Sequence, residues 1–168
     1  MKGLNSPHLL LASSNPLKMI VNLNHLLTAQ ELGKLTGELD RHVVGLFQLG
    51  MGHFTFASPL GNSDWRQKVS RLYFAAYSVR RAVALKHSGA FSTDPSDHKN
   101  VEQLPSGMAN RESHITNLRD LREDRNLADY SHFGTVSDLV LAPDDAVAFV
   151  TRFIGDCRQF LQQNGIAV

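Results

Sequence analysis

LRDLREDRNLADYSH, at Leu118–His132, has the periodicity of an amphipathic helix. At about 100° per residue, the face centred on Arg125 also carries three apolar side chains, those of Leu118, Leu121 and Ala128. His132 lies on the same face, and Asp129 lies only slightly further round. The face that should turn toward a protein core therefore combines apolar residues with an arginine, an acid and a histidine.

Charged residues on such a face are rarely buried unless they are paired or functional, and the sequence leaves both explanations open. In the first, Arg125 and Asp129 form an i, i+4 ion pair, and His132 is a polar residue at the fraying end of the helix. In the second, Arg125 and His132 line a functional cleft, with Arg122 at the edge of the same face.

Length and composition are those of a globular protein with one domain. The 168 residues are 42% hydrophobic and 20% charged, which is ordinary for such a fold. The net charge of +1 excludes a large basic field, so nucleic-acid binding would need a local patch. The chain has a single cysteine, no signal peptide and no apolar run of about 18 residues that could span a membrane, which predicts a cytoplasmic protein without a membrane partner.

Helical spacing of apolar residues continues along the chain, and no segment alternates as a β-strand does. Caps and breakers predict five helices, at residues 17–27, 28–50, 62–87, 108–132 and 143–164. Residues 50–61 are predicted as a loop, and residues 90–107 as a long connection with a helical turn at 101–104. We therefore predict an all-α, four- to five-helix up-and-down bundle.

The predicted helices form one domain with two parts. Residues 1–61 would be an N-terminal arm, irregular over residues 1–16, followed by helices that pack on the bundle. Residues 62–168 would be the helical core.

The predicted helix at 62–87 carries the most basic surface of the chain, opposite an apolar face. Its basic residues are Arg66, Lys68, Arg71, Arg80, Arg81 and Lys86. We regard Arg71, Arg80 and Arg81 as candidates for contacts with RNA phosphates, and the alternative is a solvated polar face. Tyr73 and Tyr77 of the same helix are predicted to be core aromatics.

The sequence lacks the motifs of several common classes of enzyme and binding site. The chain has no Walker-type or dinucleotide-binding glycine loop, no Gly-x-Ser-x-Gly and no Cys-x-x-Cys. None of its eight histidines stands in metal-ligand spacing, so we predict no metal and no cofactor. Cys157 lies on the apolar face of the last helix and is predicted to pack there. His98 and His114 are predicted at the surface.

SRLYFAAY at Ser70–Tyr77 and, about fifty residues later, LREDRNLADY at Leu121–Tyr130 resemble motifs of the HEPN domain family. The second motif is most similar to that of small bacterial HEPN proteins with an Arg-x-x-Ala-Asp-Tyr signature. The resemblance covers residues 62–168. It implies a helical bundle that forms a homodimer through the motif helices, often acting as a metal-independent ribonuclease toxin.

The family's catalytic signature is an arginine followed, after a short spacer, by a histidine. The residues that match it here are Arg125, Asn126 and His132, which Asp129, Tyr130 and Arg122 would support. At the shortest family spacing the histidine position is occupied by Tyr130. The resemblance therefore also allows a non-catalytic HEPN module that binds a nucleotide, RNA or a protein. An antitoxin or a nucleotidyltransferase would be the partner, in a toxin–antitoxin or phage-defence pair.

Metal-independent RNA cleavage needs a base, an acid and a cation. His132 can act as the base or the acid near neutral pH, and Arg125 can bind the phosphate as the cation. The two residues lie about 10 Å apart along one helix, so a bend after Asp129 or a second copy of the chain must bring them together. Three functions stay open: a HEPN-like ribonuclease, a non-catalytic HEPN module, and an unrelated helical interaction protein.

Overall fold

The computed structural model describes residue 13 and residues 15–92 and 94–168. This part of the chain contains five α-helices and no strand: α2 (Pro16–Asn22), α3 (Ala29–Ala57), α4 (Trp65–Ser88), α5 (Arg111–Tyr130) and α6 (Pro143–Gln163). The connections hold three 3-10 helices: η1 (Asn62–Asp64), η2 (Pro95–Asn100) and η3 (Val136–Asp138). The predicted all-α helical bundle is confirmed, whereas most of the predicted arm at residues 1–16 lies outside the described residues.

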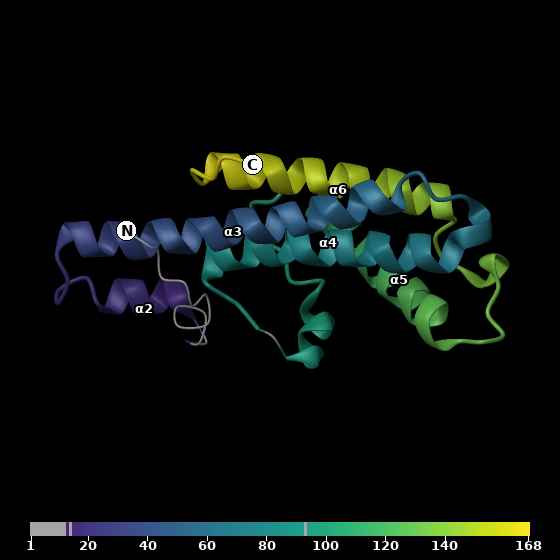
Figure 1. Ribbon diagram of the computed structural model, residues 1–168, viewed down its shortest axis with the longest axis horizontal. Coiled ribbons are helices and arrows are strands. Elements are labelled where there is room, and N and C mark those ends of the chain that lie inside the picture. The colour runs from purple at the N-terminus through teal and green to yellow at the C-terminus, as the bar shows by residue number, and fades with distance from the viewer. Residues whose placement is uncertain (1–12, 14, 93) are drawn as a thin grey trace.

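Helix α4 is the centre of the bundle and packs against α3, α5 and α6 (Figure 1). The predicted apolar face of α4 is buried, at Val69, Leu72, Ala76, Val79 and Val83. The core also includes Leu39, Val43 and Phe47 of α3, and Phe149, Phe153 and Cys157 of α6. Because α4 has neighbours on several sides, part of its polar surface is covered as well.

Three predicted helix boundaries are confirmed by the local chemistry. The Thr28 hydroxyl accepts a hydrogen bond from the Glu31 N–H, and the Glu31 carboxylate accepts one from the Thr28 N–H, which together make the predicted capping box before α3. Helix α4 is followed by Gly89, whose φ of 69° lies in the left-handed region. Helix α6 begins at Pro143, where the missing N–H costs no helical bond.

Helix α3 continues to Ala57, although we predicted a loop from Gly50 onward. A Cβ atom at Gly50 would lie 2.5 Å from Cγ2 of Val79 and 2.8 Å from the backbone oxygen of Ala75. The glycine therefore lets the backbone of α3 approach α4 closely, and it does not end the helix. The prediction was wrong because a packing glycine and a stop glycine look alike in the sequence.

Other predicted boundaries also need correction. Helix α2 spans Pro16–Asn22, five residues short of the predicted end at 27, and the helical turn expected at 101–104 lies earlier, in η2. Helix α5 ends at Tyr130, so His132 lies beyond the helix. Arg66 of α4 caps the C-terminal end of α5. Its guanidinium donates hydrogen bonds to the carbonyl oxygens of Ala128 (2.8 Å) and Gly134 (2.7 Å).

The prediction that His114 lies at the surface is wrong. Its side chain is 1% exposed, and its Nε2 lies 2.7 Å from Oδ2 of Asp156 on α6. The ring of Phe153 meets the imidazole edge-on at 5.0 Å. A carboxylate partner on α6 and an aromatic neighbour therefore make burial of this histidine possible.

Candidate functional site

Arg125 points from α5 against α4 rather than into solvent. Its Cζ lies 5.6 Å from the ring centre of Tyr73 and 5.3 Å from that of Phe74. Its Nε is 2.7 Å from Oδ2 of Asp129, although the N–H does not align as a hydrogen bond. The side chain is 14% exposed. The i, i+4 ion pair considered from the sequence is therefore present, and two aromatic rings of α4 accommodate the charge.

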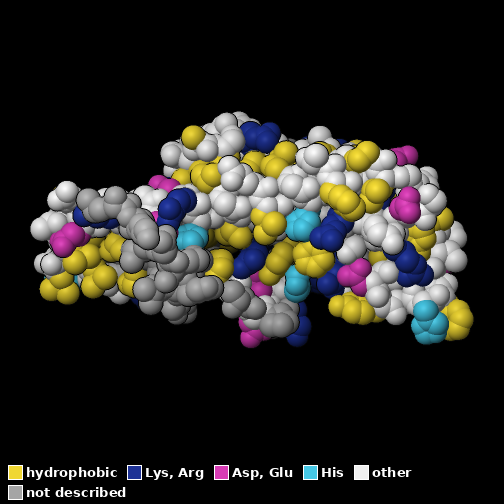
Figure 2. Space-filling model, in the orientation of Figure 1, with side chains coloured by type: hydrophobic (Ala, Val, Ile, Leu, Met, Phe, Trp, Pro, Cys, Tyr) yellow, Lys and Arg dark blue, Asp and Glu magenta, His cyan; other side chains and the backbone are white. Residues whose placement is uncertain are grey.

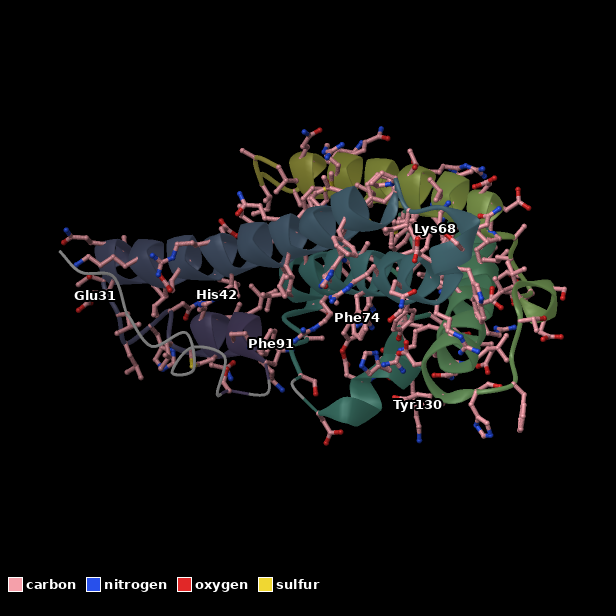
Figure 3. All side chains as sticks on the ribbon, turned by 45° about the vertical axis from the view of Figure 1, so that its right-hand side comes forward. Glu31, His42, Lys68, Phe74, Phe91 and Tyr130 are labelled. Carbon is pink, nitrogen blue, oxygen red and sulfur yellow. The ribbon has the colours of Figure 1, made fainter. Side chains whose placement is uncertain are left out.

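The other predicted catalytic and supporting residues surround Arg125 unevenly. Asn126 accepts a hydrogen bond from Nη1 of Arg125 at 3.3 Å. Tyr130, which is labelled in Figure 3, has its ring centre 5.4 Å from the Cζ of Arg125. Arg122 forms an ion pair with Glu102 at 3.1 Å. All the predicted catalytic and supporting residues except His132 thus lie in the second half of α5, between Arg122 and Tyr130.

His132 is separate from this cluster. It lies in the exposed segment after α5, and its ring centre is 4.2 Å from that of Phe133. Arg125 packs inward onto α4, and no contact between His132 and Arg125 is found among the described residues. The chain leaves the helix at Ser131, whose ψ is 112°, but the ring that His132 contacts is that of Phe133.

The three predicted RNA-binding arginines do not form one patch. Arg80 is 4% exposed, and its Nε donates to the carbonyl oxygen of Gln103. Arg81 lies over the rings of Tyr77 and Phe91, at 5.4 and 4.8 Å. Arg71 alone is exposed. The predicted basic face is divided because the connection between α4 and α5 covers the second half of α4.

A groove of about 460 Å³ lies beside Arg71, between the end of α3, the first half of α4 and the end of α5. It is lined by Phe56, Arg66, Gln67, Ser70, Arg71, Phe74, Ala128 and Asp129. Near the middle of the face shown in Figure 2, histidine and basic side chains lie among hydrophobic ones. The groove exists because α3 continues past Gly50 and so places Phe56 opposite α5.

Arg66 and Arg71 line this groove, and Arg125 adjoins it through its ion pair with Asp129; the three arginines differ in their partners. Arg66 donates to main-chain carbonyls, and Arg125 is paired with Asp129. Among the described residues, no carboxylate lies within 4.0 Å of the Arg71 guanidinium. Its polar neighbour is Nδ1 of His53, at 3.4 Å. Arg71 is therefore the cation that remains free to bind an anion in the groove.

Two histidines that we had not selected from the sequence lie next to this region. The ring centres of His53 and His98 are 5.8 and 6.0 Å from that of Phe74. Burial lowers the pKa of both, and a neighbouring arginine adds to the effect: Arg71 for His53 and Arg125 for His98. Both imidazoles are therefore neutral near pH 7.

The sequence contained an indirect signal for His98. Tyr73 and Tyr77 are one helical turn apart on a buried face, and buried tyrosine hydroxyls need hydrogen-bond partners. The structure supplies these partners from η2, at His98 and Asp97. No comparable signal existed for His53, since its position depends on the unpredicted extension of α3.

Comparison with family models, with curated proteins and with solved structures finds no match to this chain. In the described ranges, no group of three or more His, Cys, Asp or Glu side chains is placed to hold a metal ion. None of the helices described is both long and apolar enough to cross a membrane.

Proposed function

We propose that this chain is a HEPN-like protein that binds single-stranded RNA in the groove between α3, α4 and α5. The observation that carries the proposal is Arg71, an exposed cation without a carboxylate partner in the described structure, in a groove that is also lined by two aromatic rings. Phe56 is 55% exposed and has its ring centre 5.7 Å from the Arg71 Cζ, and Phe74 lines the same groove.

These residue types match the chemistry of a single RNA strand. The guanidinium of Arg71 can bind a phosphate through two parallel N–H bonds. The exposed face of Phe56 can stack on a base, a contact worth about 1–3 kcal/mol. The neutral imidazole of His53 adds a polar group without a charge. Phosphate contact and base stacking in one groove favour RNA over a purely acidic partner.

Single-stranded RNA should therefore bind more tightly than a duplex of the same length, because a duplex keeps its base faces stacked inside. Fluorescence anisotropy with a short labelled strand, in buffer containing EDTA, measures both affinities. The logarithm of the association constant should fall with the logarithm of salt with a slope of about −0.7 for each phosphate neutralised, and Arg71 accounts for one. A duplex that binds as tightly as the strand would contradict the proposal.

A second candidate is metal-independent cleavage by a homodimer, with the protein as the toxin of a toxin–antitoxin or defence pair. The observation that favours it is the exposure of the segment that carries His132: Tyr130 is 72% and Phe133 85% exposed. Such an apolar segment can face a second copy of the chain, whose Arg125 would complete the site. An antitoxin or a nucleotidyltransferase would then be the natural partner.

This candidate predicts a dimer by light scattering at micromolar concentration, and RNA cleavage that persists in EDTA. His132→Ala should abolish cleavage while changing the free energy of unfolding by less than about 1 kcal/mol, because the side chain is exposed. The control is His25→Ala, which changes another exposed histidine, before α3, and should cut normally. A monomer that leaves RNA intact would exclude this candidate without affecting RNA binding.

A further inference from the structure

Two buried tyrosines of α4 hold two consecutive residues of η2. The Tyr77 hydroxyl donates to Oδ2 of Asp97 at 2.9 Å, and the Tyr73 hydroxyl lies 2.8 Å from Nδ1 of His98. Burial raises the pKa of both tyrosines, that of Tyr77 to about 12, so both hydroxyls stay protonated. This arrangement fixes η2 on α4 and with it the orientation of the His98 ring.

We assign the tautomer of His98 from the same contacts. A buried Tyr73 hydroxyl needs an acceptor, and Nδ1 of His98 lies within reach. With the hydroxyl as donor, the proton of the neutral ring is placed on Nε2, the nitrogen that Tyr73 does not contact. The ring is stacked on Tyr77 at 4.3 Å, which leaves it little freedom to turn. His98 is thus an oriented donor that needs no positive charge.

His98 and Arg125 lie against the same aromatic ring. The ring centre of Phe74 is 6.0 Å from that of His98 and 5.3 Å from the Cζ of Arg125. Phe74 also lines the groove that contains Arg71. Because Phe74 both lines the groove and contacts these two side chains, an RNA strand bound in the groove has to extend past only this one ring to reach His98 and Arg125.

We propose that His98 and Arg125 form a second phosphate subsite, which binds the phosphodiester next to the one held by Arg71, with a base stacked on Phe74 between them. This inference rests on the proposed binding of RNA in the groove. Arg125 contributes the charge, offset in part by Asp129, and His98 contributes a neutral N–H bond. Tyr73 is a positioning residue, because it acts on the ligand only through His98.

The test uses the full chain at pH 7.5 in EDTA, with one short single-stranded RNA measured at several salt concentrations. His98→Phe keeps an aromatic ring beside Tyr77 but removes the donor, and should weaken binding about tenfold. Its salt slope should equal that of the wild type, because no charge is lost at this pH. Arg71→Ala, in contrast, should lower the slope by about 0.7. His98→Gln restores an amide N–H and should recover part of the affinity.

Tyr73→Phe gives an independent reading if His98→Phe fails to fold. It leaves the His98 ring in place but frees its tautomer, so binding should weaken about threefold, less than in His98→Phe. Failure of the wild type to bind RNA would contradict the proposed function itself. RNA binding that depends on Arg71 but is unchanged in His98→Phe would overturn only the second subsite. RNA that His98→Phe binds normally but no longer cuts would also overturn it, by making His98 catalytic.

Discussion

Replacing Asp124 with alanine is expected to lower the free energy of unfolding by about 3 kcal/mol. The carboxylate is 1% exposed and accepts hydrogen bonds from the N–H groups of Val140 (2.7 Å) and Leu141 (2.9 Å). These two bonds hold the segment that leads from α5 into α6. Alanine would leave two amides without partners, at about 1–3 kcal/mol for each one that stays buried.

The matched control for Asp124→Ala is Glu123→Ala, one residue earlier on the same helix. The Glu123 side chain is 56% exposed and pairs with Arg122 at 3.3 Å, a contact worth at most about 0.5 kcal/mol. Urea unfolding of the two variants measures the difference. Similar small losses in both would mean that Asp124 does not anchor the connection.

The pH dependence of the free energy of unfolding is a second test of the role of Asp124. Burial raises the pKa of its carboxyl, even though the two backbone N–H bonds act in the opposite direction. The folded protein therefore binds this proton more tightly than the unfolded chain does. The contribution of Asp124 to stability should be largest below its unfolded pKa and should decrease as the pH rises through the folded pKa. Asp124→Asn should remove that decrease.

Gly50→Ala is the second exchange with a large expected effect, a loss of about 2 kcal/mol. The new Cβ would lie 2.8 Å from the backbone oxygen of Ala75, and backbone in a helix cannot move aside as a side chain can. Gly45→Ala on the same helix is the control, because nothing lies within 4 Å of its Cβ position. There, alanine should stabilise the protein by about 0.5–1 kcal/mol through its helix propensity.

In thermal or urea unfolding, the free energy of unfolding should therefore fall in Gly50→Ala and rise in Gly45→Ala. This result would show that α3 runs unbroken through Gly50 and packs there on α4. If both exchanges stabilised the protein, Gly50 would not lie at a helix contact, and the extension of α3 that places Phe56 and His53 at the groove would be wrong.

The helix pattern could be predicted from the sequence because its signals are local. Capping by Thr28 and Glu31, the left-handed Gly89 and the first-turn Pro143 each depend on a few neighbouring residues. The apolar faces of α4 and α6 were also predictable, since helical periodicity alone defines them. Gly50 was misread because its role depends on contacts with residues of another helix.

The candidate site could be predicted only in part. The sequence showed that Arg125 and Asp129 share a face with apolar residues, and the structure explains this face by an ion pair between them that packs on Tyr73 and Phe74. The sequence did not show which basic residues of α4 are covered, because the segment that covers them, between α4 and α5, has no helical periodicity. His98 comes from the same connection, so its place beside Arg125 could not be foreseen.

Arg71 allows the most direct test of RNA binding in the groove. The measurement is the dissociation constant of one short single-stranded RNA, in EDTA, for the wild type, Arg71→Ala and Arg152→Ala. Both exchanges lower the net charge from +1 to 0, and Arg152 is exposed on α6, which contributes no residue to the groove. The account predicts that Arg71→Ala weakens binding at least about tenfold and that Arg152→Ala stays within about twofold of the wild type. Equal losses in the two variants would contradict it.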